Sequence, residues 1–255
     1  MGLAAETRPN DRRERYVTRA AERVCLANGS RYSLLPYQEL ARLAGLWYDA
    51  CAEATLRGNY APLADWVRNQ AQAAADQGFE LADLLQFLRL CRQVAIEKEG
   101  WNEDLFAELD AIIDEAFANL RHLLPWNIPE GLNYLTGKGR VDHAWEEYAA
   151  SIIKPRRDRR AYCRNKLRFP IRVRGRLRTG SVDEFAYTEN VARGGLYFLS
   201  NRPYFKGAKV GVIYPYWDTY GAINREYPAE VVRIDDHSTA KGVAIKFLVN
   251  LGPPR

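Results

Sequence analysis

The chain lacks any long hydrophobic run. Its 255 residues contain no uninterrupted apolar stretch of about 18 residues, the length that a membrane-spanning helix needs. Residues 1–17 contain no apolar stretch of signal-peptide length, and Gly2 lacks the downstream serine or threonine that N-myristoylation prefers. We therefore expect no membrane span, no lipid anchor and a cytoplasmic location.

Cysteines are few and widely spaced. The four of them, Cys25, Cys51, Cys91 and Cys163, form no C-x-x-C pair. Three lie in helical patterns, where a small thiol is commonly buried. This spacing predicts reduced cysteines with a packing role and no metal site.

Sequence signatures of catalysis are also missing. The chain has no P-loop, no G-x-S-x-G motif, no cluster of metal ligands and no convincing catalytic triad. We therefore expect a protein that is not an enzyme, with no catalytic residues and no cofactor.

The two halves of the chain differ in the sign of their net charge. Residues 1–154 contain 17 Lys and Arg against 23 Asp and Glu, a net charge of −6. Residues 155–255 contain 20 against 9, a net charge of +11, and the two values sum to the +5 of the whole chain. This asymmetry indicates two domains, with any anion-binding site in the second.

The first half shows the 3.6-residue apolar period of amphipathic helices. Gly58 follows the pattern of residues 36–57, and Gly100 follows that of residues 80–99. Each glycine predicts a helix end. We expect a compact all-α bundle over residues 1–124. Its helices are predicted near residues 13–28, 36–57, 62–77, 80–99 and 102–124.

The pattern breaks at residues 125–139, where prolines, glycines and polar residues predict a linker. One short amphipathic helix follows at residues 140–155. The interdomain segment is therefore predicted to span residues 125–156, and the second domain residues 157–255.

The second half shows short runs with alternating apolar residues, separated by turn signals. Six such runs in about ninety residues predict a small antiparallel β-barrel. The predicted fold class is thus α+β and multidomain, with a helical bundle followed by a six-stranded barrel. The predicted strands cover residues 169–175, 184–190, 195–200, 208–216, 227–235 and 242–248.

Two motifs at the start of this half resemble those of the PilZ domain family. The first is an R-x-x-x-R motif, Arg160 to Arg164, preceded by Arg159 and directly ahead of the first predicted strand. The second resembles [D/N]-x-S-x-x-G and runs from Asn190 through Ala192 to Gly195, in a polar turn between two strands. The resemblance covers about residues 157–249 and implies a PilZ-type barrel.

Members of this family bind cyclic di-GMP, so the resemblance implies that ligand. Arginine forks match phosphate oxygens and the O6/N7 edge of guanine, and they also stack on bases. An asparagine can both donate to and accept from a guanine edge, and a glycine permits close approach of the backbone. The ligand-binding residues that the resemblance implies are Arg159, Arg160, Arg164, Asn190, Ala192 and Gly195.

Three alternatives stay open. Ala192 replaces the serine of the motif, which would suit a degenerate PilZ adaptor that binds proteins and no nucleotide. Arg164 and Arg168 also spell R-x-x-x-R, although Arg168 is expected to lie on the first strand. Nucleic-acid binding through the basic half is a weaker alternative, with stacking residues at Tyr214, Tyr216, Trp217 and Tyr220.

The helical half is similar to the helical N-terminal domain of RsbT co-antagonist-type regulators. The matching turns are the residues from Gly58 to Leu63 and from Gly78 to Leu81. This resemblance, over about residues 12–124, implies a globin-like signalling or dimerisation module without haem. We therefore expect an unknown protein partner for this half, and a homodimer is possible.

Overall fold

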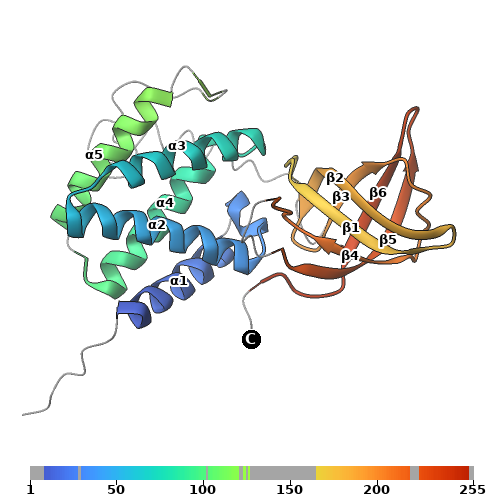
Figure 1. Ribbon diagram of the computed structural model, residues 1–255, viewed down its shortest axis with the longest axis horizontal. Coiled ribbons are helices and arrows are strands. Elements are labelled where there is room, and N and C mark those ends of the chain that lie inside the picture. Colours follow the sequence, from blue (N-terminus) through green and yellow to red (C-terminus); the bar gives the residue numbers. More distant parts are fainter. Residues whose placement is uncertain are drawn as a thin grey trace, which may run out of the picture. The chain divides into compact units, whose positions relative to one another are not determined.

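The computed structural model describes residues 9–27, 30–101, 103–120, 123–124, 126, 165–218 and 224–252. The chain divides into two compact units, one built from helices and the other from strands. Figure 1 labels the elements of both units, and each unit is described by itself. The predicted fold class is confirmed, because five helices are followed by a closed six-stranded antiparallel barrel.

The helical unit contains five α-helices and one short 3₁₀ helix, η1, over Arg31–Leu34. The five helices predicted for residues 1–124 are present, although the first begins four residues earlier than its apolar pattern indicated. The short helix predicted at residues 140–155 lies outside the described residues. None of the helices among the described residues is long and apolar enough to cross a membrane. The α-helices are α1 (Pro9–Leu26), α2 (Tyr37–Arg57), α3 (Ala61–Asp76), α4 (Leu81–Glu99) and α5 (Glu103–Leu120).

Glycines end two of the helices, as the sequence predicted. Gly58 follows the last residue of α2 with φ of 63°, and Gly100 caps α4 with φ of 66°. This left-handed conformation terminates the helical hydrogen-bond pattern and is easiest for glycine, which has no Cβ.

Aromatic side chains from different helices form the centre of the bundle. Tyr16 of α1, Trp47 of α2 and Phe106 of α5 are at most 1% exposed, and their rings lie in series with centroids 6.0 and 6.1 Å apart. The Tyr16 hydroxyl donates a hydrogen bond to the Cys91 carbonyl of α4 at 3.1 Å. The three rings and this hydrogen bond therefore join four helices around one core.

The cysteines of the described helices are packing residues. Cys25, Cys51 and Cys91 are buried and form no disulfide, while Cys163 lies outside the described residues. Burial raises the pKa of Cys91 to about 12, which keeps its thiol protonated and unreactive. The predicted packing role is confirmed for these three thiols.

One buried carboxylate in the bundle lies beside a single arginine. Asp110 of α5 is 3% exposed, and its Oδ2 lies 3.5 Å from Nε of Arg92 on α4. Neither Asp110 oxygen accepts a hydrogen bond from the residues that the structure describes. Burial raises the pKa of Asp110 to about 6, although the charge of Arg92 acts to lower it.

We expect the Asp110→Asn variant to lose a pH-dependent part of the bundle's stability. A carboxyl with a pKa of about 6 when folded and about 3.9 when unfolded binds more protons in the folded state. The free energy of unfolding that this carboxyl adds is therefore fully present below about pH 4 and is lost as the pH rises through about 6. The change amounts to about 2–3 kcal/mol, at 1.36 kcal/mol per pKa unit.

Urea unfolding at about pH 4.5 and 7.5, followed by circular dichroism of the helices, measures this term. Wild type should lose stability between the two pH values relative to Asp110→Asn. The Asp104→Asn variant, which changes an exposed carboxylate of the same helix, should follow the wild-type profile. Parallel profiles for wild type and Asp110→Asn would refute the expectation.

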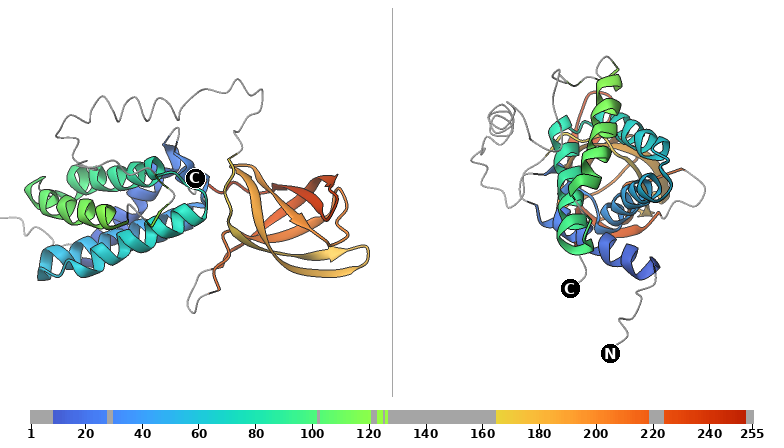
Figure 2. Two further views of the ribbon diagram at one scale, coloured as in Figure 1. Left: turned by 90° about the horizontal axis from the view of Figure 1, so that it is seen from above. Right: turned by 90° about the vertical axis from the view of Figure 1, so that its left-hand side faces the viewer.

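The second unit is a closed barrel in which every neighbouring strand pair is antiparallel. The strand order around it is β1-β2-β3-β6-β5-β4, and pairing of β1 with β4 closes the circle. Figure 2 shows the strands curling around one another. The strands are β1 (Pro170–Leu177), β2 (Gly180–Ala192), β3 (Gly195–Ser200), β4 (Lys209–Ile213), β5 (Glu226–Asp236) and β6 (Lys241–Phe247).

Five of the six strands have boundaries that differ by one to four residues from those that the alternating pattern predicted, and two of the differences affect candidate residues. β1 begins at Pro170, so Arg168 lies ahead of the strand and not on it. β4 ends at Ile213, because Pro215 has no N–H with which to extend the ladder. Tyr214 is 2% exposed and packs on Phe169 and Phe247 in the barrel core.

Candidate functional site

The second motif forms the end of the β2–β3 hairpin. Asn190 pairs with Tyr197, and Ala192 pairs with Gly195. Val191 and Leu196 between them are 1% and 4% exposed, so they point into the barrel. Because side chains alternate along a strand, Asn190, Ala192 and Tyr197 share the outer face of the sheet.

A β-bulge at Glu189 puts Asn190 on that outer face. Val182 and Thr188 are buried, so strict alternation from these two residues would point Asn190 inward. The pairing of β2 with β3 shifts between Thr188 and Asn190, which leaves Glu189 as the extra residue of the bulge. The bulge therefore presents the motif asparagine at the surface and buries Val191 in its place.

Gly195 approaches the backbone of β6 closely. A Cβ at this position would lie 2.1 Å from the carbonyl oxygen of Ile245. No side chain fits there, so the packing of β3 on β6 already requires glycine. The sequence predicted a close backbone approach at Gly195, and the neighbour in the structure is β6; a role in ligand binding stays a prediction.

The chain enters the barrel beside the second motif. The Asn165 N–H donates to the Val191 carbonyl at 2.9 Å, and the Val191 N–H donates to the Asn165 carbonyl at 2.8 Å. Asn165 immediately follows Arg164, the last arginine of the first motif. Arg159, Arg160 and Arg164 themselves lie outside the described residues.

A buried threonine fixes the next residues of this entering segment. Thr188 is 0% exposed, and its hydroxyl donates to the Leu167 carbonyl at 2.5 Å while accepting from the Phe169 N–H at 2.8 Å. The backbone N–H of Thr188 also donates to the Phe169 carbonyl at 2.9 Å. Residues 165–169 are thus held along β2, with their register set by one side chain.

The structure adds three outer-face residues that the sequence analysis missed. Tyr197 lies opposite Asn190 on β3, Arg233 of β5 follows in the same row through Ala244, and Lys246 of β6 pairs with Gly195. The Arg233 guanidinium carbon lies 5.9 Å from the centroid of the Tyr197 ring. A ring and two cations, one of them paired with Asp235, therefore share the outer face of the sheet with the second motif.

Tyr197 is fixed against β6. Its hydroxyl lies 2.8 Å from Nε2 of His237, and its ring covers Gly242, where a Cβ would lie 1.7 Å from the hydroxyl oxygen. Burial and the neighbouring Asp235 raise the pKa of Tyr197, so the hydroxyl stays neutral. Alternation along "GLYF" is sufficient to predict that Tyr197 points outward. The outward position of its partner Asn190 could not be predicted in this way, because it depends on the bulge.

Four more arginines follow the first motif at alternating positions: Arg172, Arg174, Arg176 and Arg178. Arg172 forms a bidentate pair with Asp183 at 2.7 and 2.8 Å, and Arg174 lies within 3.7 Å of Asp183 and Glu226. Arg176 and Arg178 are exposed. Two of these four arginines are therefore paired with carboxylates of the barrel unit.

The nucleic-acid alternative loses one of its stacking residues. Tyr214 is buried in the core and so cannot meet a base, while Tyr220 lies outside the described residues. Tyr216 and Trp217 stay half-buried at the surface. Among the described residues, two of the four rings that this alternative used lie at the surface.

Comparison with known proteins identifies the barrel. The family model for the PilZ domain matches residues 156–254. The predicted PilZ domain in the C-terminal half is confirmed. This match does not extend to the helical half, so its similarity to RsbT co-antagonist-type regulators stays a prediction. No curated protein matches the chain.

Solved structures of low sequence identity are also similar. The inhibitor of motility MotI/DgrA of Bacillus subtilis is 16% identical, with a TM-score of 0.29 over 36% of this chain and 44% of that chain. The PilZ domain of YcgR from Escherichia coli with c-di-GMP is 14% identical, with a TM-score of 0.27 over 36% and 79%. The MrkH–c-di-GMP complex of K. pneumonia is 16% identical, with a TM-score of 0.29 over 36% and 45%. The chain thus spans less than half of the first of these proteins.

Proposed function

We propose that the barrel unit binds cyclic di-GMP and that the chain is a receptor for this second messenger, not an enzyme. The dinucleotide lies on the outer face around Asn190, between the second motif and the arginine segment. The PilZ domain match over residues 156–254 supports the ligand class. The pairing of Asn165, which follows the first motif, with Val191 of the second motif supports the site.

The pairing of Asn165 with Val191 is the observation that carries this proposal. It holds the residue after Arg164 against the residue between Asn190 and Ala192. Consecutive Cα atoms are about 3.8 Å apart. Arg164, the residue directly before Asn165, can therefore reach the same ligand as Asn190. Two motifs that are 25 residues apart in the sequence thereby serve one site.

The surrounding groups suit a guanine dinucleotide with two phosphates. Asn190 offers a donor and an acceptor to a guanine edge. Lys246 is exposed beside Gly195 and adds a positive charge for phosphate. Arg159, Arg160 and Arg164 supply guanidinium groups for phosphate oxygens and base edges in the proposal.

We expect the Arg164→Ala variant to bind cyclic di-GMP about ten- to hundredfold more weakly than wild type. A hydrogen bond to a charged group contributes about 1.5–3 kcal/mol, which corresponds to that range. Isothermal titration of the full chain measures it, with GTP as the ligand control. Arg176→Ala is the matched variant, because Arg176 is an exposed arginine of β1 that pairs with Ser181, at the end of β2 opposite the second motif.

Binding that is equal in wild type, Arg164→Ala and Arg176→Ala would reject the arginine segment as the clamp. Absence of heat with wild type up to about 100 μM ligand, weaker than about −5.5 kcal/mol, would reject the receptor function. The second candidate function, a protein adaptor of PilZ type without nucleotide binding, would then be favoured by Ala192.

The Ala192→Ser variant separates these two functions. It restores the motif hydroxyl at a half-buried position on the hairpin. If the receptor proposal holds, one added hydrogen bond should strengthen binding by about two- to twelvefold, the equivalent of 0.5–1.5 kcal/mol. An adaptor that has lost the site in other ways would stay without affinity.

The helical unit completes the proposal as the part that passes the signal on. Ligand binding orders groups on the barrel, and a helical partner-binding or dimerisation module can respond to that change. The partner protein and a homodimer are both part of this proposal. Crosslinking of the full chain with and without cyclic di-GMP would show whether association through residues 9–120 follows the ligand.

A further inference from the structure

A second feature of the barrel surface lies on β1 and β2. Phe185 and Tyr187 point outward from β2 and are 60% and 52% exposed. Two large rings of this exposure on one strand are typical of a contact surface, because burying them against a partner removes apolar area from water. Neither ring belongs to the two PilZ motifs.

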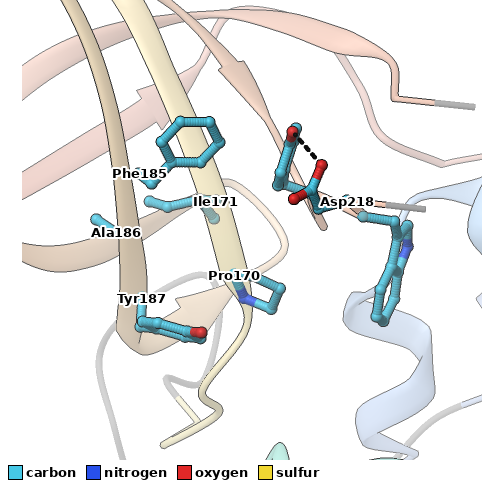
Figure 3. A pocket seen from close by; sticks show the side chains of 8 residues that line it. Pro170, Ile171, Phe185, Ala186, Tyr187 and Asp218 are labelled. Atoms are coloured by element: carbon cyan, nitrogen blue, oxygen red, sulfur yellow. Dashed lines mark hydrogen bonds between the residues drawn. The ribbon is translucent and has the colours of Figure 1, made fainter. Parts of the chain in front are cut away.

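These rings line a pocket with a volume of about 430 Å³, shown in Figure 3. One wall is built by β1 and β2 and the other by the segment that follows β4. The volume lies within the range of small-molecule sites in proteins, about 300–1,000 Å³. The lining residues are Pro170, Ile171, Phe185, Ala186, Tyr187, Tyr216, Trp217 and Asp218.

Hydrogen bonds hold the second wall in place. The Tyr216 N–H donates to the Pro170 carbonyl at 2.8 Å. The Asn224 side chain accepts from the Trp217 N–H at 2.8 Å and donates to the Trp217 carbonyl at 2.7 Å. The rings of Tyr216 and Phe185 meet edge to face with centroids 5.0 Å apart. The pocket is therefore preformed, which reduces the entropy lost on binding.

The polar groups of the pocket select the ligand. Asp218 places a carboxylate across from Phe185 (Figure 3), and its Oδ1 accepts a hydrogen bond from the Tyr216 hydroxyl at 3.4 Å. Such a carboxylate can accept hydrogen bonds from a planar ring that carries two adjacent donors. The N1–H and N2 amino group of guanine form such an edge, whereas adenine presents an acceptor at N1.

Two arginines argue against a cationic ligand. The guanidinium carbons of Arg168 and Arg172 lie 4.8 Å from the ring centroids of Tyr187 and Phe185 respectively. Asp183 neutralises Arg172, but no ion pair to Arg168 occurs among the described residues. Arg168 at the rim therefore suits an anion such as a phosphate.

We propose that this pocket binds a guanine base, stacked on its aromatic rings, with its donor edge on Asp218 and its phosphate near Arg168. The base can come from cyclic di-GMP or from a guanine mononucleotide. The first source rests on the function proposed above, because the same dinucleotide would then reach from Asn190 towards Tyr187. The second source is independent of it.

Titration of GMP and AMP into the ¹⁵N-labelled full chain tests the proposal, with the indole N–H signal of Trp217 as the readout. GMP should shift this signal and bind about five- to hundredfold more tightly than AMP, the discrimination that one bidentate pair to a base supplies. The Asp218→Asn variant should lose this preference, and Tyr187→Leu should weaken GMP by a similar factor through lost stacking.

Matched variants lie elsewhere on the barrel. Phe205→Leu changes a ring that also carries a stacked arginine, Arg178, and Asp236→Asn changes another exposed aspartate. Both should bind GMP as wild type does. Equal shifts by GMP and AMP, no shift by either, or an unchanged preference in Asp218→Asn would each overturn the proposal.

Adding cyclic di-GMP to the GMP complex separates the two sources. Displacement of GMP, with weaker cyclic di-GMP binding in Asp218→Asn, would assign the base to the dinucleotide. Simultaneous binding would assign a separate mononucleotide site. If cyclic di-GMP does not bind but the Asp218-dependent GMP shift persists, the receptor function fails and the guanine pocket stands.

Discussion

The Gly195→Ala variant is expected to lose about 3 kcal/mol or more of the barrel's stability. The added Cβ would lie 2.1 Å from the carbonyl oxygen of Ile245, and both groups belong to paired backbone of β3 and β6. Overpacking of a close-packed site typically costs about 1–3 kcal/mol, and more when neither side can yield. Here the strands themselves must separate, so the effect lies at or beyond the upper end.

Hydrogen exchange of barrel peptides in the full chain, measured by mass spectrometry, reports this loss. Gly175→Ala is the graded control, because its Cβ would meet the Val210 side chain at 3.0 Å and the Lys209 carbonyl at 3.2 Å. We expect a loss of about 1 kcal/mol or less there, since a side chain can move by a few tenths of an ångström. Equal protection in the two variants would contradict this difference.

The same measurement on Gly195→Ala distinguishes a structural role of Gly195 from a direct contact with the ligand. If Gly195→Ala exposes all barrel amides, loss of ligand binding in that variant says nothing about a direct contact. If the barrel stays protected while cyclic di-GMP binding falls, the glycine would serve the ligand directly. The structure favours the first outcome because the nearest atoms are those of β6.

The sequence predicted those parts of the fold that depend on short-range periodicity. The helices could be recognised because residues such as Leu84 and Leu88 repeat at helical spacing and lie in the core. Strands such as β6 alternate between apolar and other residues, with Val243 and Ile245 buried. Each of these patterns lies within one helix or strand, so the element could be predicted without knowing which element packs against it.

The candidate site was predictable only in part, because its geometry depends on pairing between elements. The bridge from Asn165 to Val191 holds the residue after the first motif against the second motif, and no pattern within one element predicts that pairing. The bulge at Glu189 left no clear sequence signal, and without it Asn190 would point inward. Tyr197 and Lys246 join the site only through the register of β3 with β2 and β6, which periodicity does not supply.

The aromatic pocket was also predictable only in part, because its residues come from different elements. Tyr216 and Trp217 were considered as stacking residues, but Phe185 and Tyr187 were not, since they are ordinary members of an alternating strand. Antiparallel pairing sets Arg172 opposite Phe185 and Pro170 opposite Tyr187. Closure of β1 onto β4 then brings residues about 30 positions apart into one pocket.

Thr188→Val is the second variant with a large expected effect. Valine has the shape of threonine but lacks the hydroxyl that serves Leu167 and Phe169 at a position that is 0% exposed. Two buried backbone groups lose a partner, and each such loss costs about 1–3 kcal/mol. The Phe169 carbonyl keeps its bond from the Thr188 backbone, so we expect a total of about 2–4 kcal/mol and a barrel that still folds.

In Thr188→Val, residues 165–169 should also be held less firmly along β2, and this should lower the affinity for cyclic di-GMP. In Thr188→Val, the amides of Phe169 and Val191 should exchange faster than those of β5, because the residues that follow Arg164 are no longer held along β2. Cyclic di-GMP affinity should fall by about five- to thirtyfold, the equivalent of ordering one further residue of backbone at about 1–2 kcal/mol. Thr179→Val, at the exposed β1–β2 turn, should change neither exchange nor affinity. A destabilised Thr188→Val barrel with wild-type affinity would mean that the arginine segment binds without this anchor, and the role given to the Asn165 bridge would have to be withdrawn.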